Sequence, residues 1–309
     1  MKTWINQIIP QTRKKYRDKI SKYTKLKKMA IKLHGQYCNL TGFLHVLPDF
    51  YIIGFAKCGT TSLYEYLVQH PIIYPPIGKE IAFFDEYYNR GTNWYKACFP
   101  LKFNKLITTK IYNKQFLTGE ATPRYIDNPY APLRIKKLTP NAKFIVLLRN
   151  PIDRVFSNYM MNVNSALESE REKLSFEKAL ALENERIKGE YEKMQQDESY
   201  FSWAYYLYAY LNQGIYVDKI QKWKEIFPKN PLLIIQSEKL FQDPQKTYNR
   251  VLKFLGASDY ELPEFKKFKI GHYKENKIEP NLRRQLCEYF KPHNERLYKL
   301  LGERFDWDE

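Results

Sequence analysis

Compact apolar runs alternate with amphipathic helical patterns through most of the chain. The predicted strands are residues 50–55 (FYIIGF), 115–118, 143–148 (KFIVLL) and 232–236 (LLIIQ). Helical spacing of apolar side chains follows two of these strands, over residues 61–69 and again after residue 150. Continuous apolar strands separated by helices are typical of a parallel sheet covered on both faces. The pattern therefore predicts a doubly wound α/β fold, in which ligands bind at the carboxyl ends of the strands.

Two later regions depart from this alternation. Residues 168–200 are rich in Glu and Lys at helical spacing, which predicts an exposed helical segment outside the core (a helical excursion). The same segment could also form one side of a ligand cleft. The C-terminal stretch predicts one helix over residues 281–290, a break at Pro292, and a second helix over residues 294–301. We expect Gly302 to end that last helix.

The first 47 residues differ from the rest. Their apolar positions recur at helical spacing and are Tyr16, Ile20, Tyr23, Ala30 and Leu33. Lys and Arg side chains occupy the other faces, so we expect a basic amphipathic helical extension over residues 1–47 and one domain over residues 48–309. Two interpretations of the helix stay open: a solvated helix packed on the domain, or peripheral contact with a membrane surface or another polyanion.

Composition changes this picture little. A chain of 309 residues with 44% hydrophobic content can form a sizeable core. Its net charge of +17 attracts polyanions but does not distinguish nucleic acid, anionic lipid, acidic glycan and charged nucleotide. The four cysteines are far apart, which predicts reduced thiols in a cytoplasmic protein. No apolar run approaches the roughly 20 residues of a membrane-spanning helix, and the N-terminus lacks a signal-peptide core.

The sequence GFAKCGTTS over residues 54–62 follows the first predicted strand and opens a helix. Gly59 permits a tight backbone approach, and the first amides and the dipole of the helix favour an anion. Lys57 and three hydroxyl groups add directed donors. The motif differs from the triphosphate-binding loop GxxxxGK[ST], because Thr60 follows its second glycine where that loop has lysine. We interpret it as a phosphate-binding loop.

A second motif follows the strand at residues 143–148. This strand leads directly into Arg149, and Ser157 comes about two turns into the next helix, within LLRNPIDRVFSNY. The guanidinium fork of arginine suits a phosphate group. Alternatively, Arg149 caps the edge of the sheet and Ser157 is an ordinary serine of the helix. The first motif favours the interpretation in which both face the same crevice.

Together, KxGTTS and LLRNPxDRxxSxY resemble the two donor-binding signatures of the sulfotransferase superfamily. Further similar segments are residues 79–85 (KEIAFFD), 119–123 (GEATP), 214–216, 254–256 and 290–297. They cover the chain from about residue 50 to its end. The set is most similar to the heparan-sulfate branch of the superfamily and its bacterial relatives.

This resemblance implies a sulfuryl transfer from 3'-phosphoadenosine 5'-phosphosulfate, a co-substrate, to a hydroxyl or amine of a carbohydrate or sugar-containing metabolite. It implies no metal and no nucleic-acid partner. The implied donor-binding residues are Lys57, Cys58, Gly59, Thr60, Thr61, Ser62, Arg149 and Ser157. Glu80 stands at the position of the proposed catalytic base, and Lys57 is the natural group to stabilise the leaving oxygen.

The chain also departs from the pattern of that branch. Ala82 and Ala121 replace a histidine and a lysine found in many members, so Lys79 or Arg124 is expected to substitute for the lysine. The paired cysteines near the donor loop are missing. The expected donor-covering loop lies within residues 269–277 and includes His272, Tyr273 and Lys274.

Two other classes of function stay open. A P-loop kinase or nucleotide hydrolase requires a magnesium-binding acid at a strand end, whereas residues 143–148 lead into Arg149. A basic polyanion-binding module would account for the charge and the N-terminal helix, but it leaves both phosphate motifs unexplained.

Overall fold

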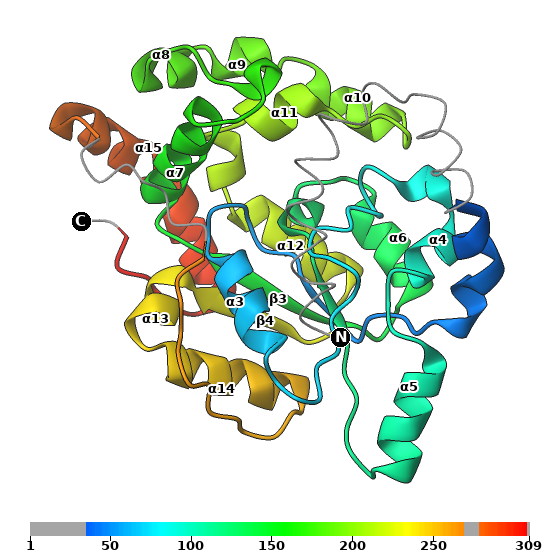
Figure 1. The fold of residues 1–309 in the computed structure, drawn as a ribbon. Helices are drawn as coiled ribbons and strands as arrows, with labels where there is room; N and C mark the ends of the chain where they lie inside the picture. The colour runs from blue at the N-terminus through cyan, green and yellow to red at the C-terminus, as the bar shows by residue number, and fades with distance from the viewer. Residues whose placement is uncertain (1–34, 269–277, 308–309) are drawn as a thin grey trace.

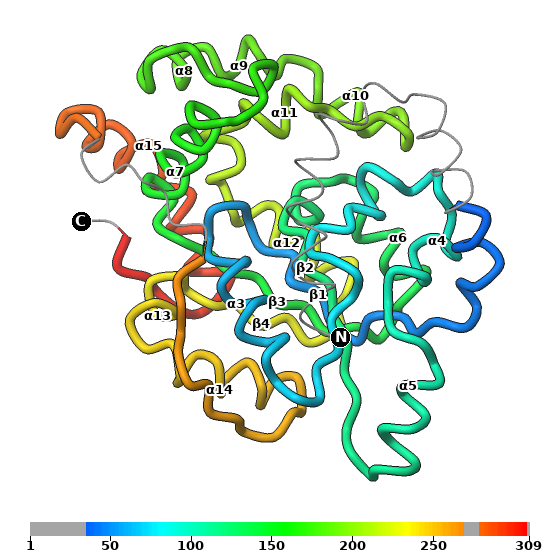
Figure 2. The backbone as a smooth tube through the Cα atoms, in the orientation of Figure 1, coloured from blue at the N-terminus to red at the C-terminus, as the bar shows by residue number. Residues whose placement is uncertain are grey.

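The computed structural model describes residues 35–268 and 278–307. It has four parallel strands in the order β2-β1-β3-β4 (Figures 1 and 2). Their bounds are β1 Phe50–Ile52, β2 Gly119–Ala121, β3 Lys143–Leu148 and β4 Leu232–Gln236. β1 and β2 are wholly buried and β3 nearly so, as expected for a sheet covered on both faces. The predicted parallel α/β fold is confirmed.

The strand order creates a switch point beside β1. From β1 the chain passes to β2 on one side, and from β2 it returns across the sheet to β3 on the other side (Figure 2). The loops that follow β1 and β3 therefore leave in opposite directions, and a crevice opens between them. Both phosphate-binding motifs begin at this crevice.

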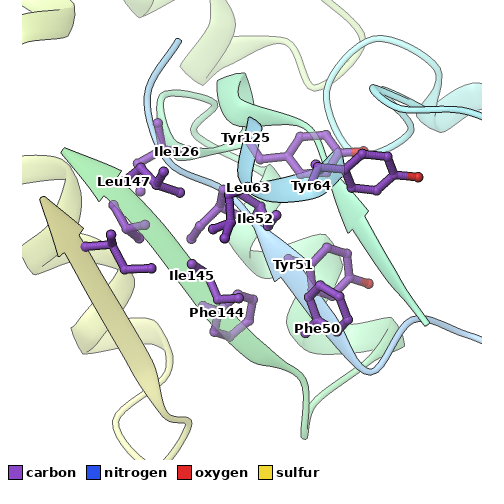
Figure 3. Close-up of a cluster of buried hydrophobic side chains, with 14 of the residues drawn as sticks. Phe50, Tyr51, Ile52, Leu63, Tyr64, Tyr125, Ile126, Phe144, Ile145 and Leu147 are labelled. Atoms are coloured by element: carbon purple, nitrogen blue, oxygen red, sulfur yellow. The ribbon is translucent and has the colours of Figure 1, made fainter. Parts of the chain in front are cut away.

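Helices cover the two faces of the sheet. On one face lie α3 (Thr60–Leu67), α13 (Ser237–Gln242) and α14 (Pro244–Leu255), and on the other lie α6 (Ala131–Leu138) and α12 (Val217–Ile226) (Figure 1). Side chains that alternate along the strands reach both layers. Leu63 of α3 lies over Ile52 (Figure 3), whereas Phe144 packs against Trp223 of α12 with ring centroids 5.3 Å apart.

The remaining elements surround this core. They are α4 (Thr92–Lys96), α5 (Lys102–Leu106), α7 (Pro151–Val163), α8 (Phe176–Ala181), α9 (Glu183–Arg186), α10 (Glu190–Gln196), α11 (Trp203–Tyr208) and α15 (Pro280–Leu301). Single turns are η1 (Gly42–Leu44), η2 (Tyr88–Arg90), η3 (Ile107–Ile111), η4 (Pro123–Ile126), η5 (Glu168–Glu170) and η6 (Asn212–Gly214). The predicted helical excursion corresponds to α8, α9 and α10, which lie with α11 beyond one end of the sheet (Figure 1).

One predicted strand was misplaced. The apolar run at residues 115–118 is not β2: Phe116 stacks on Tyr74, and Leu117 makes an isolated bridge to Ile73. The ladder with β1 begins only at Gly119, next to this run. A Cβ atom on Gly119 would lie 2.3 Å from the Phe50 ring, so a larger residue would not fit there.

The predicted break at Pro292 was wrong. α15 runs from Pro280 to Leu301 without interruption, with Pro292 inside it. A proline inside a helix removes one backbone hydrogen-bond donor. The helix continues through Pro292 because Leu286, Phe290 and Leu297, on both sides of it, are buried against the protein. Gly302 adopts φ 70° after the last turn, so the predicted end of the helix is confirmed.

The predicted basic helix at residues 13–33 lies outside the described residues, and the domain boundary near residue 47 stays a prediction. Within the described ranges, no helix combines the length and the apolar character that crossing a bilayer requires.

Candidate active site

A cavity of about 640 Å³ opens at the carboxyl ends of the strands, where β1 and β3 diverge. It is lined by Ala56, Lys57, Gly59, Thr60, Thr61, Glu80, Thr122, Pro123, Arg124, Arg149, Asp153, Ser157, Met161, Tyr206, Ser237, Glu238, Phe241, Lys267 and Phe268. The two sequence motifs and the segment of Glu80, which are far apart in the chain, thus line one cavity.

The loop after β1 has an unusual backbone. Gly54 packs closely against the backbone of β3, because a Cβ atom there would lie 2.3 Å from the Leu147 nitrogen. Lys57 and Gly59 have φ of 69° and 86°, both in the left-handed region that favours glycine. Gly59 caps α3, so the first amides of this helix open toward the cavity that Thr60 and Thr61 line. This arrangement suits an anion, as the sequence predicts.

Arg149 joins the two motifs. Its guanidinium donates to the Lys57 carbonyl at 3.3 Å, and the Tyr216 hydroxyl donates to the Arg149 carbonyl at 2.9 Å. The Asn150 side chain then caps α7 by accepting from the amides of Ile152 and Asp153. Arg149 is thereby aimed from the end of β3 into the cavity.

Ser157 reaches the same cavity from α7. Ser157 is 2% exposed, and it is among the residues that line the cavity. Arg149 and Ser157 thus line one cavity, as the interpretation with a shared crevice expects.

Glu80 lies in a loop tied to the end of β2. Its amide donates to the Ala121 carbonyl at 3.1 Å, and both Glu80 and Ala82 adopt left-handed backbone angles, with φ of 60° and 58°. The Glu80 carboxylate forms an ion pair with Lys79 Nζ at 2.5 Å. Non-glycine residues in this region are costly, by about 1–3 kcal/mol each, and persist only where the surroundings enforce them.

A buried carboxylate lies beneath this loop. Glu120 accepts hydrogen bonds from the hydroxyls of Tyr125 at 2.6 Å and Thr122 at 2.7 Å, and from Tyr95. Tyr125 in turn accepts from the amide of Phe83 at 2.9 Å. Burial raises the pKa of Glu120 to about 7, against the lowering effect of the three hydroxyl donors. Glu120 therefore organises the hydroxyl groups that hold the backbone beyond Glu80.

Arg124 lines the cavity, but its charge is already balanced. Its guanidinium lies 2.5 Å from Asp85 and 2.5 Å from Glu86 and packs over the rings of Phe201 and Tyr206. The side chain therefore builds the wall between the Glu80 loop and α11. This makes Arg124 a weaker substitute for the missing lysine at Ala121 than the sequence analysis expects.

Three expected residues do not line the cavity with their side chains. Cys58 is fully buried, and burial raises the pKa of its thiol to about 12. Ser62 is also buried, and its hydroxyl accepts from the Phe268 amide at 3.1 Å. Lys79 is not among the lining residues, and its ammonium group forms an ion pair with Glu80, which is.

The sequence analysis missed the contribution of β4. Ser237, Glu238 and Phe241 line the cavity from the first turns of α13, directly after that strand. Glu238 also accepts from the Asn150 amide at 2.8 Å, which fixes the end of β3 against α13. The position of Ser237 and Glu238 at a predicted strand end was a usable signal, because ligands of parallel sheets bind there. Tyr206 had no such signal.

The expected donor-covering loop, with His272, Tyr273 and Lys274, lies outside the described residues. Lys267 and Phe268, which immediately precede it, line the cavity. Within the described part of the chain, no group of three or more His, Cys, Asp or Glu side chains could hold a metal ion.

Comparison with known proteins gives similar sulfotransferases. The membrane-associated sulfotransferase kil1 of Dictyostelium discoideum is 28% identical over 86% of this chain and 68% of its own length. Human heparan sulfate glucosamine 3-O-sulfotransferase 3B1 is 28% identical over 85% of this chain and 65% of its own length. Human bifunctional heparan sulfate N-deacetylase/N-sulfotransferase 3 is 32% identical over 82% of this chain, which spans only 30% of that longer protein.

A solved structure agrees with these relatives. The crystal structure of a sulfotransferase from Alicyclobacillus acidocaldarius matches 85% of this chain and all of its own, with 30% identity and a TM-score of 0.63. The family model described as a sulfotransferase domain matches residues 47–307, which is most of the chain. The protein whose two phosphate-binding motifs meet at the end of this sheet belongs to the sulfotransferase family.

Proposed function

We propose that the protein transfers a sulfuryl group from 3'-phosphoadenosine 5'-phosphosulfate to a hydroxyl or amine of a carbohydrate. The observation that carries this proposal is the meeting of the two motifs and Glu80 around one cavity of about 640 Å³. A donor with phosphate groups at both ends of its ribose requires two anion sites at a fixed separation. The motifs after β1 and β3 supply two such sites from different strands.

In this proposal the first motif holds the 5'-phosphosulfate. Lys57, Thr60 and Thr61 line the cavity, and α3 begins at Thr60 with its first amides available to an anion. Arg149 and Ser157 hold the 3'-phosphate from the other side, where a guanidinium and a hydroxyl both donate to oxygen. The residues present therefore fit the donor without a metal ion.

The transfer is an in-line displacement at sulfur. A bond forms between the acceptor oxygen or nitrogen and sulfur, and the bond from sulfur to the 5'-phosphate oxygen breaks. Glu80 takes the proton that the acceptor loses, and Lys57 stabilises the charge that grows on the leaving oxygen. The products are the sulfated acceptor and adenosine 3',5'-bisphosphate.

Glu80 is suited to this role by its position. Its carboxylate is about half exposed at the cavity edge, with 44% side-chain exposure, so an acceptor can reach it. The ion pair with Lys79 keeps the carboxylate next to a cation. In the transfer, Lys79 would orient Glu80 and would not contact the donor directly.

The carbohydrate acceptor rests on the relatives. Two of them are named as acting on heparan sulfate, one by 3-O-sulfation and one by N-sulfation, which leaves both hydroxyl and amine acceptors open. The cavity wall near Glu80 includes Tyr206 and Pro123, whose apolar faces suit the faces of sugar rings.

A cytoplasmic location, proposed from the isolated cysteines, stays a prediction.

The test is a melting experiment without magnesium. Adenosine 3',5'-bisphosphate at 100 times its Kd should stabilise the wild-type chain by about 2.7 kcal/mol, and adenosine 5'-phosphate at the same concentration should stabilise it far less. Arg149→Ala should remove most of this difference, about 10- to 100-fold in affinity, because a charge-assisted contact to the 3'-phosphate is lost.

The matched control is Arg296→Ala, which removes an exposed ion pair with Asp218 and leaves the cavity intact. If Arg149→Ala discriminated between the two nucleotides as the wild type does, the assignment of the second motif would be wrong. Stabilisation by ATP with magnesium, but not by the bisphosphate, would instead favour a P-loop kinase or hydrolase.

A further inference from the structure

A projecting basic arm lies at the edge of the molecule away from the active site. It consists of residues 101–115, with α5 and the turn η3, and it extends beyond the body of the protein (Figure 1). The arm leaves the body next to residues 45–49, which lead into the amino end of β1, because His45 pairs with Leu101 and the Val46 amide donates to the Pro100 carbonyl at 3.0 Å. The cavity opens at the carboxyl ends of the strands, so the arm plays no part in it.

The outer side chains of the arm are apolar and unusually exposed. Phe103, Leu106, Ile111 and Tyr112 are 63%, 54%, 69% and 64% exposed. The base of the arm is anchored separately, because Thr108 is buried and its hydroxyl lies 3.1 Å from that of Tyr74. The exposed side chains are therefore not needed to attach the arm to the core. Clusters of this kind mark interaction surfaces in soluble proteins.

The segment before β1 continues this apolar surface. Tyr37, Leu40, Phe43 and Leu44 are also exposed, and the chain reaches the base of the arm one residue later, at His45. The Asn93 side chain of α4 donates to the Asn39 carbonyl at 3.1 Å, which fixes this segment against the body. Two exposed apolar segments thus meet at one edge of the molecule.

The charged side chains of the arm itself are all cations, and one carboxylate, Asp49, lies beside them in the hollow at the base of the arm. Between residues 87 and 119 the sequence has no Asp or Glu, and its cations are Arg90, Lys96, Lys102, Lys105, Lys110 and Lys114. Lys96, Lys102 and Lys105 also line a hollow of about 680 Å³ at the base of the arm. A second copy of the same surface would bring like charges together. An anionic partner with an apolar interior would satisfy both features.

We propose that the α5 arm docks the protein on an anionic lipid bilayer. Phe103, Leu106, Ile111 and Tyr112 enter the interface between headgroups and acyl chains, where aromatic and apolar side chains are stable. The surrounding lysines bind lipid phosphate and carboxylate groups, each adding attraction at the surface of an anionic membrane. This placement leaves the active-site cavity, at the opposite edge of the sheet, open to the aqueous phase.

The test uses the full chain and sedimented vesicles made of equal parts of phosphatidylcholine and phosphatidylserine. Phe103→Glu with Leu106→Glu should lower the vesicle-bound partition by about tenfold or more, because two apolar anchors become charged. The matched control is Leu133→Glu with Tyr289→Glu, which introduces the same two charges at exposed apolar positions on α6 and α15. The control should bind within about twofold of the wild type.

A charge variant gives an independent second readout. Lys102→Gln with Lys105→Gln should reduce the gain in binding that phosphatidylserine gives over phosphatidylcholine alone, and it leaves the apolar anchors in place. Circular dichroism and melting establish that each variant is folded.

Three results would overturn the proposal. In the first, the wild type fails to bind the anionic vesicles. In the second, both arm variants bind as the control does, which would assign any binding to the basic segment at residues 13–33. In the third, the Glu variant converts a dimer into a monomer at unchanged vesicle binding, which would make the arm a contact between two copies of the chain.

Discussion

The two halves of the active site are built in different ways. The donor half, formed by the loop after β1 and by Arg149, depends mainly on geometry within each motif: Lys57 and Gly59 have left-handed backbone angles, Gly59 caps α3, and Arg149 directly follows a strand. The Glu80 half depends on long-range contacts, because its loop is held by Ala121 and by the buried group around Glu120. Local geometry leaves a motif in the sequence, whereas a long-range hydrogen-bond group leaves almost none.

The first prediction concerns Lys57, which in our proposal both binds the donor and stabilises the leaving oxygen during transfer. Lys57→Ala should weaken binding of adenosine 3',5'-bisphosphate and also lower turnover, so kcat/KM should fall by more than for any change in the Glu80 half. Calorimetry and steady-state kinetics on the same preparations measure both. An unchanged affinity would remove Lys57 from the donor half.

Glu80→Gln should separate the two halves most clearly. Removal of a general base typically costs about 10²- to 10⁴-fold in rate, and the amide keeps the size of the side chain. We expect turnover to fall on that scale at saturating donor and acceptor, with nucleotide affinity nearly unchanged. A folded variant that works at the wild-type rate would exclude Glu80 as the base.

A pH series tests the buried support of the Glu80 loop. The pKa of Glu120 is raised from 4.5 to about 7 in the folded chain, so the folded state holds its proton more tightly than the unfolded state does between these values. Its contribution to the free energy of unfolding is therefore fully present below about pH 4.5 and is lost as the pH rises toward 7. The loss is on the order of 3 kcal/mol.

Glu120→Gln should remove this slope, so that the variant gains stability relative to the wild type as the pH rises. Denaturant unfolding from pH 4.5 to 8 measures the difference, with exposed Glu261→Gln as the control. Parallel slopes for wild type and Glu120→Gln would show that Glu120 does not titrate in this range. Turnover of the variant should fall more than its nucleotide affinity, because the partners of Glu120 lie on the side of the cavity that holds Glu80.

The smallest effect is expected from the N-terminal extension. Deletion of residues 1–34 should leave turnover on a small soluble acceptor within about twofold of the full chain, because both sequence motifs and Glu80 follow this segment and already line one cavity. A folded truncated chain that no longer bound the donor would place the extension inside the active domain.

The same contrast explains how much of the structure was predictable. Residues 143–148 and 232–236 matched β3 and β4 to the residue, because short continuous apolar runs between helical patterns are typical of strands in a covered parallel sheet. β2 was missed by a few residues because Gly119, Glu120 and Ala121 form a strand only through pairing with β1. Pro292 was misread because helix packing outweighed one lost hydrogen bond.

The candidate site was predicted unevenly for the same reason. Lys57, Thr60, Thr61, Arg149 and Ser157 were found from their positions after strands, and they line the cavity. Arg124 and Glu120 have partners up to 39 residues away in sequence. No local sequence pattern therefore indicates that the charge of Arg124 is balanced or that Glu120 supports the site. The buried side chains of Cys58 and Ser62 likewise become evident only from the packing of α3.

The most direct test of the central claim is transfer of radioactive sulfate from labelled 3'-phosphoadenosine 5'-phosphosulfate to a panel of glycans, with a chelator present and without ATP. We predict that the wild type labels at least one glycan and releases one adenosine 3',5'-bisphosphate for each sulfate transferred, and that Glu80→Gln binds the donor but labels the same glycan about 10²- to 10⁴-fold more slowly. Binding of the bisphosphate by neither protein, or equal labelling by both, would contradict the account.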